Sequence, residues 1–436
     1  MSTHDTKPHT TDDAKPTHDT RQPTPPTIET LPPETVDKIA AGEVVTRPSA
    51  ALKEMLENAL DAGATTIAVA ARHGGLKLLQ IADNGHGIRL ADFGKVCERF
   101  ATSKLRAYAD LEQIQTFGFR GEALASISHV AHVTVTSKTE AEVCAHRASY
   151  ASGALVAAKP GERAEPRPCA GTRGTQIVVE DMFYNLPMRR AAMKSAAEEY
   201  SRIMQVVQSY AIENAGVAMS CRKLGETSAE LHTQPGHSTL DVIRLVYGAN
   251  LARELLPLEV DEPSVHLAVR GYVSNANFSQ KRLTLLLFIN KRLVESSHLR
   301  RTLEDVYAAC LPKGAHPWIY VSITLPPENL DVNVHPTKRE VRFLHQEEIT
   351  AALQAAMRER LVGANASRTF FTQASLPGAE STGREQAAQS RQSRRTVAAA
   401  EADKAAGVRG GGGGGGGEGR AAAGAKTKEP RKLVRV

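Results

Sequence analysis

Two polar side chains on one predicted helix, with a third on the same face, could act together on a water molecule or a metal ion. Glu54, Asn58 and Asp61 occupy positions i, i+4 and i+7 of the stretch 48–63, so they share one helix face. A carboxylate accepts a proton from water, and an amide oxygen is a hard ligand suited to Mg²⁺. The alternative is a solvated helix face, which carries polar residues at the same spacing.

The stretch that holds these residues has the features of a helix of about four turns. Pro48 suits its first turn and Gly63 suits its C-terminal end. Its apolar residues recur at helical spacing and predict a buried face: Leu52, Met55, Leu56, Ala59 and Leu60. A short helix over 33–41, ended by Gly42, should precede it, and strands over 66–71 and 76–82 should follow.

A second polar motif ends the later of these two strands. Asp83 is followed by Gly85 and Gly87, whose missing Cβ atoms let a ligand approach the backbone closely. The Asp83 carboxylate could accept a hydrogen bond from an exocyclic amine such as that of adenine. The alternative is an ordinary Asp-Asn-Gly turn.

Two further motifs suit phosphate. Thr102, Ser103 and Lys104 offer two hydroxyls and an ammonium in succession, although a polar loop after a helix would read the same way. Gly118 and Gly121 flank a loop that feeds a helix starting at Glu122, and backbone N–H groups at such a helix start attract anions. The Walker A motif and the full dinucleotide fingerprint are absent from the sequence.

The 436 residues predict several units. Residues 1–27 and the glycine-rich stretch 363–436 should be disordered. The net charge of +6 permits a polyanionic partner, and the five scattered cysteines indicate a reducing compartment without a zinc-site spacing. Apolar periodicity predicts further strands over 130–137, 175–180, 265–273, 283–289 and 319–325, helices over 199–215, 240–247, 297–310 and 346–361, and a loop over 153–174.

Taken in order, the motifs resemble the nucleotide site of the gyrase, Hsp90, histidine kinase and MutL ATPases. Longer strings resemble MutL mismatch repair proteins: Ile39-Ala-Ala-Gly-Glu-Val, Glu57-Asn-Ala-Leu-Asp-Ala, Gly118-Phe-Arg-Gly-Glu-Ala-Leu-Ala-Ser-Ile and Asp331-Val-Asn-Val-His-Pro-Thr-Lys. The resemblance runs from about Ile28 to Pro377, and the string that starts at Phe288 is most similar to the eukaryotic branch of the family.

The resemblance implies an α+β fold in two folded domains. Residues 28–232 would form a two-layer α/β sandwich of the gyrase/Hsp90/histidine kinase/MutL ATPase type. Residues 233–362 would form a second α/β domain of the ribosomal protein S5-like transducer type.

The resemblance also implies a role for each motif. Glu54 would be the general base that orients water, and Asn58 would coordinate Mg²⁺ beside ATP. Asp83 would read adenine, and Lys338 in the second domain would reach the γ-phosphate. Arg292 matches a family arginine implicated in DNA binding, with a plain surface arginine as the alternative. The remaining nucleotide-binding residues would be Gly87, Thr102, Ser103, Lys104, Gly118, Arg120, Gly121, Glu122, Ala123 and Leu124.

For the whole chain the resemblance implies a slow, Mg²⁺-dependent ATPase of DNA mismatch repair in the nucleus. Its partners would be a second MutL-type subunit in a heterodimer, MutS-type mismatch recognition proteins, and double-stranded DNA bound weakly and without sequence preference. No membrane association is expected. The family's C-terminal dimerisation domain and nuclease metal motif are not found before Val436, so no nuclease activity is expected. The alternative is a scaffold that binds nucleotide without turnover.

Overall fold

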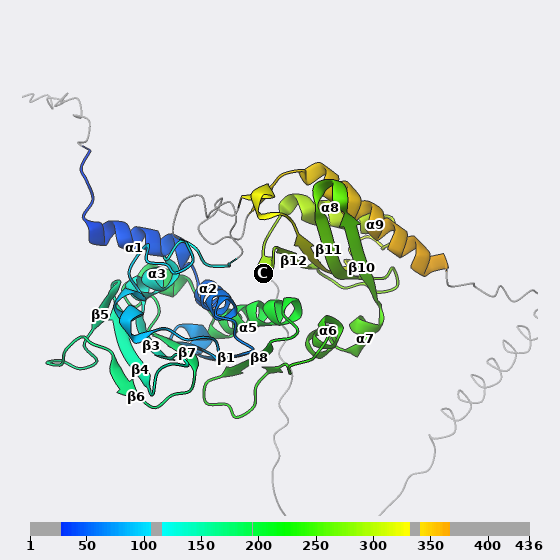
Figure 1. Cartoon of the computed structure of the whole chain (residues 1–436). Coiled ribbons are helices and arrows are strands. Elements are labelled where there is room, and N and C mark those ends of the chain that lie inside the picture. Colours follow the sequence, from blue (N-terminus) through cyan, green and yellow to red (C-terminus); the bar gives the residue numbers. More distant parts are fainter. Residues whose placement is uncertain (1–27, 106–115, 194, 332–340, 367–436) are drawn as a thin grey trace, which may run out of the picture. The chain divides into compact units, whose positions relative to one another are not determined.

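The computed structural model describes residues 28–105, 116–193, 195–331 and 341–366 (Figure 1). Its α-helices are α1 (Pro33–Val44), α2 (Pro48–Asp61), α3 (Ala123–Val130), α4 (Pro187–Ala192), α5 (Ala196–Glu213), α6 (Thr239–Tyr247), α7 (Ala249–Arg253), α8 (Ser297–Ala308) and α9 (Gln346–Ala366). Short 3-10 helices are η1 (His73–Gly75), η2 (Leu90–Lys95), η4 (Pro263–Val265) and η5 (Pro327–Asn329).

The first part of the chain builds one large mixed sheet. Its strands are β1 (Thr66–Arg72), β2 (Leu78–Asp83), β3 (His132–Lys138), β4 (Ala145–Ala151), β5 (Ala154–Val156), β6 (Arg167–Cys169), β7 (Gly174–Glu180), β8 (Ala218–Lys223) and β9 (Leu231–His232). They run in the order β5-β4-β3-β7-β2-β1-β8-β9, with β6 paired to β4. Burial alternates along β3, which is the pattern of a sheet covered on one face.

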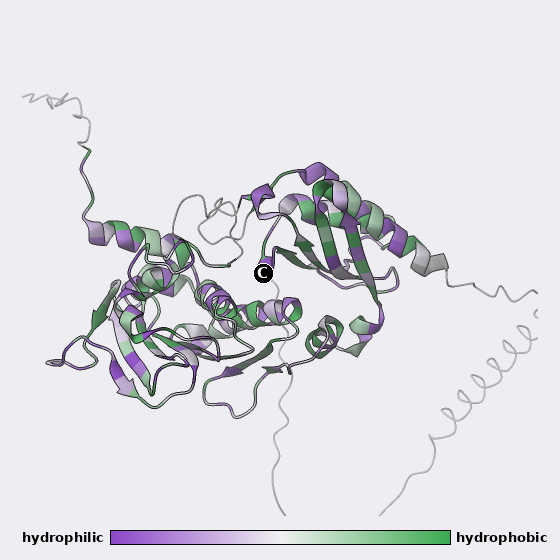
Figure 2. Ribbon diagram, in the orientation of Figure 1, coloured by the Kyte–Doolittle hydropathy of each residue, from purple (hydrophilic) through white to green (hydrophobic). Residues whose placement is uncertain are grey.

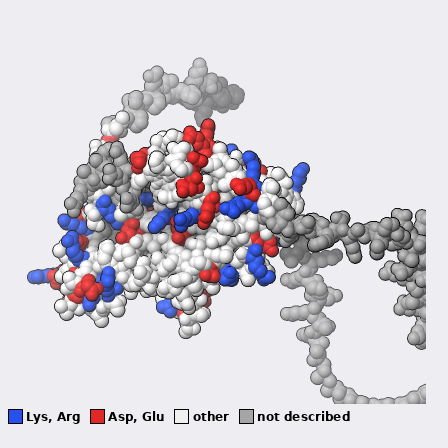
Figure 3. Space-filling view, turned by 45° about the vertical axis from the view of Figure 1, so that its right-hand side comes forward, with Lys and Arg blue, Asp and Glu red and all other residues white. Residues whose placement is uncertain are grey.

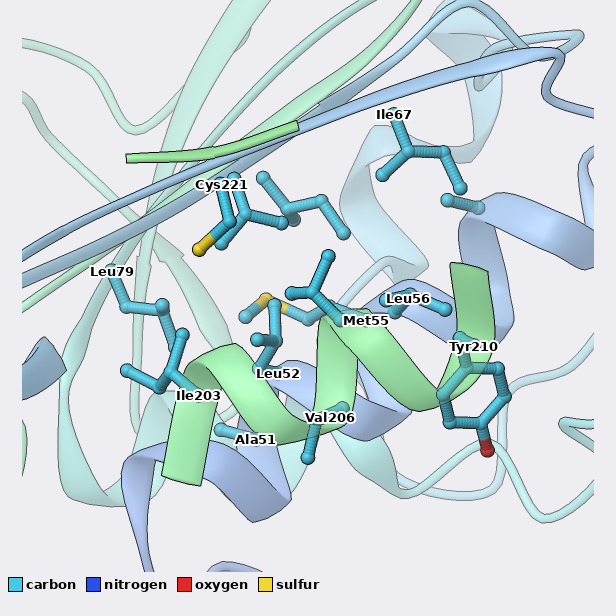
Figure 4. Packing of buried hydrophobic residues seen from close by; sticks show 14 of the residues in the cluster. Ala51, Leu52, Met55, Leu56, Ile67, Leu79, Ile203, Val206, Tyr210 and Cys221 are labelled. Atoms are coloured by element: carbon cyan, nitrogen blue, oxygen red, sulfur yellow. The ribbon is translucent and has the colours of Figure 1, made fainter. Parts of the chain in front are cut away.

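Helices α2, α3 and α5 supply that cover (Figure 1). The core between the two layers is apolar: Leu52 and Met55 of α2 face Ile67 and Leu79 of the sheet, and Ile203 of α5 packs beside them (Figure 4). Each of these side chains is at most 1% exposed. The elements that carry the candidate motifs therefore depend on one shared core.

The later part of the chain builds a second sheet. Its strands are β10 (Leu255–Glu262), β11 (Leu267–Ser274), β12 (Thr284–Ile289), β13 (Arg292–Leu293) and β14 (Trp318–Thr324), in the order β10-β11-β14-β12-β13. Strand β12 is hydrophobic along most of its length (Figure 2). Leu299 of α8 and Leu353 of α9 pack in the core of this sheet. A small ladder joins β15 (Leu330–Asp331) to β16 (Arg342–Phe343).

The two sheets share apolar contacts. Phe288 of β12 and Trp318 of β14 belong to the same buried cluster as Leu56 and Tyr210 from the first part of the chain. The domain boundary at residues 232/233 stays a prediction. The disorder of residues 1–27 and of the tail also stays a prediction, because nearly all residues of these two segments lie outside the described ranges.

The predicted elements exist, with two corrections. Helix 33–41 was expected to end at Gly42 and instead continues to Val44. The Arg189 guanidinium occupies the space beside Gly42 and donates to the carbonyls of Gly42 and Val45, which holds this end of the helix. The 153–174 stretch was expected to be a loop, and it contains the short strands β5 and β6.

Strands β4, β8 and β10 were not predicted at all. β4 and β8 mix small, polar and charged residues, and β10 has a proline among its leucines; each becomes a strand because a neighbouring strand pairs with it. Within the described residues, no helix combines the length and hydrophobicity needed to span a membrane.

The shared core predicts unequal costs for two leucine truncations. Leu52→Ala should lower the free energy of unfolding by about 2–5 kcal/mol, because it leaves a cavity beneath the sheet. Leu245→Ala in α6, where the side chain is 50% exposed, is the matched control and should stay within about 0.5 kcal/mol of the wild type. Urea unfolding of both variants measures the difference. Equal losses would contradict the packing described here.

Candidate functional site

Helix α2 is buried on nearly all sides, including its polar positions. Glu54 is 8% exposed and Glu57 is 1% exposed, so the solvated-face interpretation is wrong for this helix. Burying a carboxylate is costly unless other groups compensate for it. A face that carries buried charge within a packed core is therefore a candidate for function.

Glu57 is compensated by two neighbours. The Lys53 ammonium lies 2.7 Å from Glu57 Oε1, and the Tyr210 hydroxyl donates to the same oxygen at 2.5 Å. Burial, together with the negative charge of Glu57, raises the pKa of Tyr210 well above its usual value, so Tyr210 stays a hydrogen-bond donor. This network fixes the Lys53 and Glu57 side of α2 against α5, and Glu54 and Asn58 lie on the neighbouring stripe of the helix.

The stripe of Glu54, Asn58 and Asp61 lines a cavity of about 250 Å³. The cavity brings together residues from α2, the end of β2, the 101–104 segment, the 118–124 loop and β7. Every predicted nucleotide residue in the described ranges lines it: Glu54, Asn58, Asp83, Gly87, Thr102, Ser103, Lys104, Gly118, Arg120, Gly121, Glu122, Ala123 and Leu124. The start of α3 also opens onto the cavity, with no side chain capping its first turn, which suits an anionic ligand.

One group of polar contacts, the Lys104 cluster, consists of Lys104, Asn58, Asp61 and the amides of Phe117 and Gly118. The Lys104 ammonium donates to Asn58 Oδ1 at 2.8 Å and to Asp61 Oδ2 at 2.5 Å. The Phe117 and Gly118 amides donate to the two Asp61 oxygens, both at 2.9 Å. The Gly118 amide, expected to face phosphate, is thus bonded to Asp61.

The side-chain oxygen atoms of this cluster are suitable ligands for a divalent cation. The Asn58 amide oxygen and the Asp61 carboxylate already face a positive charge, since the Lys104 ammonium lies between them. Mg²⁺ favours such hard oxygen ligands and usually takes its remaining ligands from phosphates and water. The described residues contain no group of three or more His, Cys, Asp and Glu side chains that could hold a metal ion.

Asp83 forms another part of the cavity wall. Its Oδ1 accepts the Gly85 amide at 2.8 Å, and burial raises the pKa of its carboxyl group despite hydrogen bonds from the Gly85 and Thr175 amides. The cavity wall also includes the apolar residues Val44, Met55, Ala59, Ile88, Val96 and Ile177. An apolar wall with one carboxylate acceptor suits a flat heterocycle that carries an exocyclic amine.

Ligand access was the expected reason for the glycines of the Asp83 motif, and the structure gives a steric reason within the chain. A Cβ on Gly87 would lie 2.3 Å from the Lys138 carbonyl oxygen, and one on Gly85 would lie 2.7 Å from that of Ala62. Gly87 also has a φ of +78°, which disfavours other residues. These glycines are therefore required by close packing of the chain on itself, and Gly87 also lines the cavity.

The two remaining predicted residues, Lys338 and Arg292, have different outcomes. Lys338 lies outside the described residues. Arg292 is 3% exposed and donates to the carbonyls of Thr116 and Phe117, so the interpretation as a surface arginine is wrong. Its guanidinium is bonded to these two loop carbonyls, and a DNA contact by Arg292 stays a prediction.

Sequence reasoning missed some of the residues that shape the site. Asp61 was placed on the face of Glu54 without a role, although its position three residues after Asn58 is a usable signal. Thr175 and Ile177 enter the cavity wall from β7, a strand some 90 residues further along the chain, and Tyr210 supports α2 from α5. No local pattern marks these three residues.

Two family models match the chain. Residues 46–170 match the "Histidine kinase-, DNA gyrase B-, and HSP90-like ATPase" model, and residues 243–362 match "DNA mismatch repair protein, C-terminal domain". The first match spans α2 and all the polar motifs of the cavity.

Individual relatives agree with the models. The chain is 45% identical over 377 residues to the DNA mismatch repair protein Mlh1 of Dictyostelium discoideum, covering 80% of this chain and 43% of that protein. It is 47% identical over 346 residues to MLH1 of Saccharomyces cerevisiae, covering 79% and 44%. A solved N-terminal domain of a DNA repair protein superposes with a TM-score of 0.66 at 25% identity, covering 76% of this chain and 99% of that one.

The fold and the cavity thus define an ATPase domain of the histidine kinase, gyrase B and Hsp90 class, followed by an S5-like domain, which confirms the predicted fold class. The chain belongs to the MutL/Mlh1 family of mismatch repair proteins. It spans about half the length of the relatives it matches.

The raised pKa of Asp83 predicts a pH-dependent stability difference. A raised pKa means that the folded protein binds this proton more tightly than the unfolded chain does. The wild type therefore loses stability as pH rises through the folded-state pKa, whereas Asp83→Asn does not lose this contribution. Urea unfolding should show the variant as the more stable protein at pH 7, with the gap shrinking towards pH 4.

The control is Asp305→Asn, at an exposed position of α8, which should follow the wild type across this range. A gap between wild type and Asp83→Asn that is constant with pH would show that burial does not penalise the Asp83 charge.

Proposed function

We propose that this chain binds ATP in the cavity beside α2 and hydrolyses it as an ATPase of DNA mismatch repair. The observation that carries the proposal is the convergence of all the described nucleotide-type motifs on one cavity. The membership in the MutL/Mlh1 family supports the biological context.

In the proposed reaction, water attacks the γ-phosphorus, the bond from that phosphorus to the β,γ-bridging oxygen breaks, and ADP leaves. Glu54 takes the proton of the attacking water, and its burial removes competing solvent from the carboxylate. Asn58 would hold Mg²⁺, which would neutralise charge on the phosphate oxygens. Thr102, Ser103 and Lys104 bind phosphate, so Lys104 must exchange its contacts with Asn58 and Asp61 for the nucleotide.

The remaining parts of the nucleotide are assigned to other parts of the wall. Asp83 accepts the adenine amine, and the loop from Gly118 to Leu124 offers backbone amides to the phosphates. Lys338 reaches the γ-phosphate from the second domain, a role supported only by the family resemblance. ATP binding would then favour closure of the N-terminal domains.

The partners follow from the family. We propose a heterodimer with a second MutL-type subunit, contact with MutS-type mismatch recognition proteins, and a nuclear location. Double-stranded DNA is bound weakly, through charge and without sequence preference. On the face drawn in Figure 3, Lys and Arg side chains are interspersed with Asp and Glu, so this face offers no continuous basic surface.

Glu54→Gln should lower ATP turnover by about 10²–10⁴-fold, because it removes the proton acceptor while preserving side-chain volume. The affinity for Mg-ATP should stay close to that of the wild type, since the base acts in the transition state. Single-turnover hydrolysis and calorimetry measure the two quantities, with Glu359→Gln on the exposed face of α9 as control. Unchanged turnover would remove Glu54 from this role, and absence of turnover in the wild type would favour the non-hydrolysing scaffold.

Asn58→Ala should weaken Mg-ATP binding by roughly 10- to 100-fold, because it removes an oxygen that faces a full positive charge. Binding of ATP in the presence of a chelator should change much less. Asn277→Ala, at an exposed position after β11, is the matched control. The assignment of Mg²⁺ to Asn58 fails if the variant loses the same affinity with and without the metal.

A further inference from the structure

Arg292 is held in a rigid hairpin. The turn between β12 and β13 has two residues, Asn290 and Lys291, with φ values of +46° and +64°, and Ile289 pairs with Arg292 across it. Two residues with positive φ are the mark of a type I′ hairpin turn. The Asn290 side chain also donates to the Leu325 carbonyl at 2.9 Å and accepts the Leu325 amide at 2.8 Å. The hairpin is therefore fixed to the end of β14, and it fixes the direction of Arg292.

The Arg292 side chain ends on a loop of the first domain, 175 residues away along the chain. Its two terminal nitrogens donate to the carbonyl of Phe117 at 2.7 Å and to that of Thr116 at 2.6 Å. The guanidinium also lies 5.9 Å and 5.8 Å from the ring centres of Phe117 and Phe119. A planar fork of donors suits two successive carbonyls, and a lysine could not reproduce it.

The same loop is held from the other side by Asp61. The two carboxylate oxygens accept the amides of Phe117 and Gly118. Arg292 binds the carbonyl oxygens of these same two peptide bonds. A carboxylate at the end of α2 and a guanidinium from the second sheet thus clamp one short piece of backbone. Gly118 lines the cavity next to Lys104 and Asn58, since a Cβ on it would lie 2.7 Å from the Lys104 ammonium nitrogen and 3.0 Å from Asn58 Oδ1.

We propose that Arg292 is a positioning residue, which ties the second sheet to the Lys104 cluster and so sets the position of Gly118 in the nucleotide cavity. The proposal rests on the proposed ATPase function. A direct DNA contact would require Arg292 to leave a site where it is 3% exposed and to abandon two buried carbonyls. A movement of the second sheet would instead be transmitted to Gly118 through this clamp.

The first test is amide hydrogen exchange in the full chain without nucleotide. Arg292→Ala should speed exchange at Phe117 and Gly118 by about tenfold or more, because the loop is then held from one side only. Arg292→Lys keeps the charge and loses the paired donors, so it should show a smaller increase at the same two amides. The control Arg300→Ala, exposed on α8, should match the wild type. Acceleration spread over the core strand β3, or none at all, would overturn the proposal.

The second test separates positioning from DNA contact. Arg292→Lys should lower kcat for ATP by about tenfold or more without DNA, because the loop beside the reacting phosphate is misplaced. The DNA arm uses Arg292→Ala, which removes the charge and should keep the wild-type DNA affinity and the wild-type salt dependence of that affinity. Weaker DNA binding by Arg292→Ala with a salt slope reduced by about one, together with unchanged DNA-free turnover of Arg292→Lys, would show a phosphate contact and overturn the proposal.

The two tests also distinguish failure of the proposed ATPase function from failure of the proposed role of Arg292. If the wild type does not hydrolyse ATP, the proposed function fails, and the exchange rates at Phe117 and Gly118 still decide the position of Arg292. If the wild type is active and Arg292→Lys matches it in both kcat and exchange, only the role of Arg292 fails.

Discussion

The arrangement of the candidate site depends on the carboxylate of Asp61. It accepts the amides of Phe117 and Gly118 and the ammonium of Lys104, so one side chain joins the end of α2 to two loops that are otherwise separate in the chain. A carboxylate that accepts several charge-assisted hydrogen bonds is strongly held, which makes it a firm anchor. Neutralising the anchor should therefore release both loops together. The cavity between them is shaped by this constraint as much as by the residues that face it.

A series of aromatic contacts connects the loop at Phe117 to the second domain. Phe117 meets Tyr210 edge-to-face at 6.4 Å between ring centres, Tyr210 meets Phe288 at 5.7 Å, and Phe288 meets Tyr320 at 6.2 Å. With the hydrogen bonds of Arg292, these contacts connect the loop beside the cavity to the centre of the second sheet. A packed aromatic path of this kind transmits displacement, because close-packed interiors do not compress. The coupling between nucleotide and second domain expected for this family thus has a physical route in the chain.

Sequence reasoning succeeded where the information is local. The proline, glycine and apolar spacing of 48–63 define α2 by themselves, and the residues of the motifs around Asp83, Lys104 and Gly118 line one cavity in the folded chain. It failed where a distant segment decides the outcome. Gly42 stays helical because Arg189 packs beside it, and β4, β8 and β10 form because neighbouring strands pair with them. For Arg292 the sequence offered a DNA contact, with a surface arginine as the alternative, because its partners lie 175 residues away, beyond any pattern of spacing.

The central claim is that the cavity beside α2 is an adenine nucleotide site, and base selectivity tests it most directly. Calorimetry on the unmodified chain should compare non-hydrolysable analogues of ATP and GTP, each with Mg²⁺. Guanine presents an acceptor oxygen where adenine presents its amine, so the Asp83 carboxylate would face a second acceptor. We expect saturable binding of one ATP analogue per chain and binding of the GTP analogue weaker by roughly 10- to 100-fold. Equal affinities, or no binding of either analogue, would contradict the account.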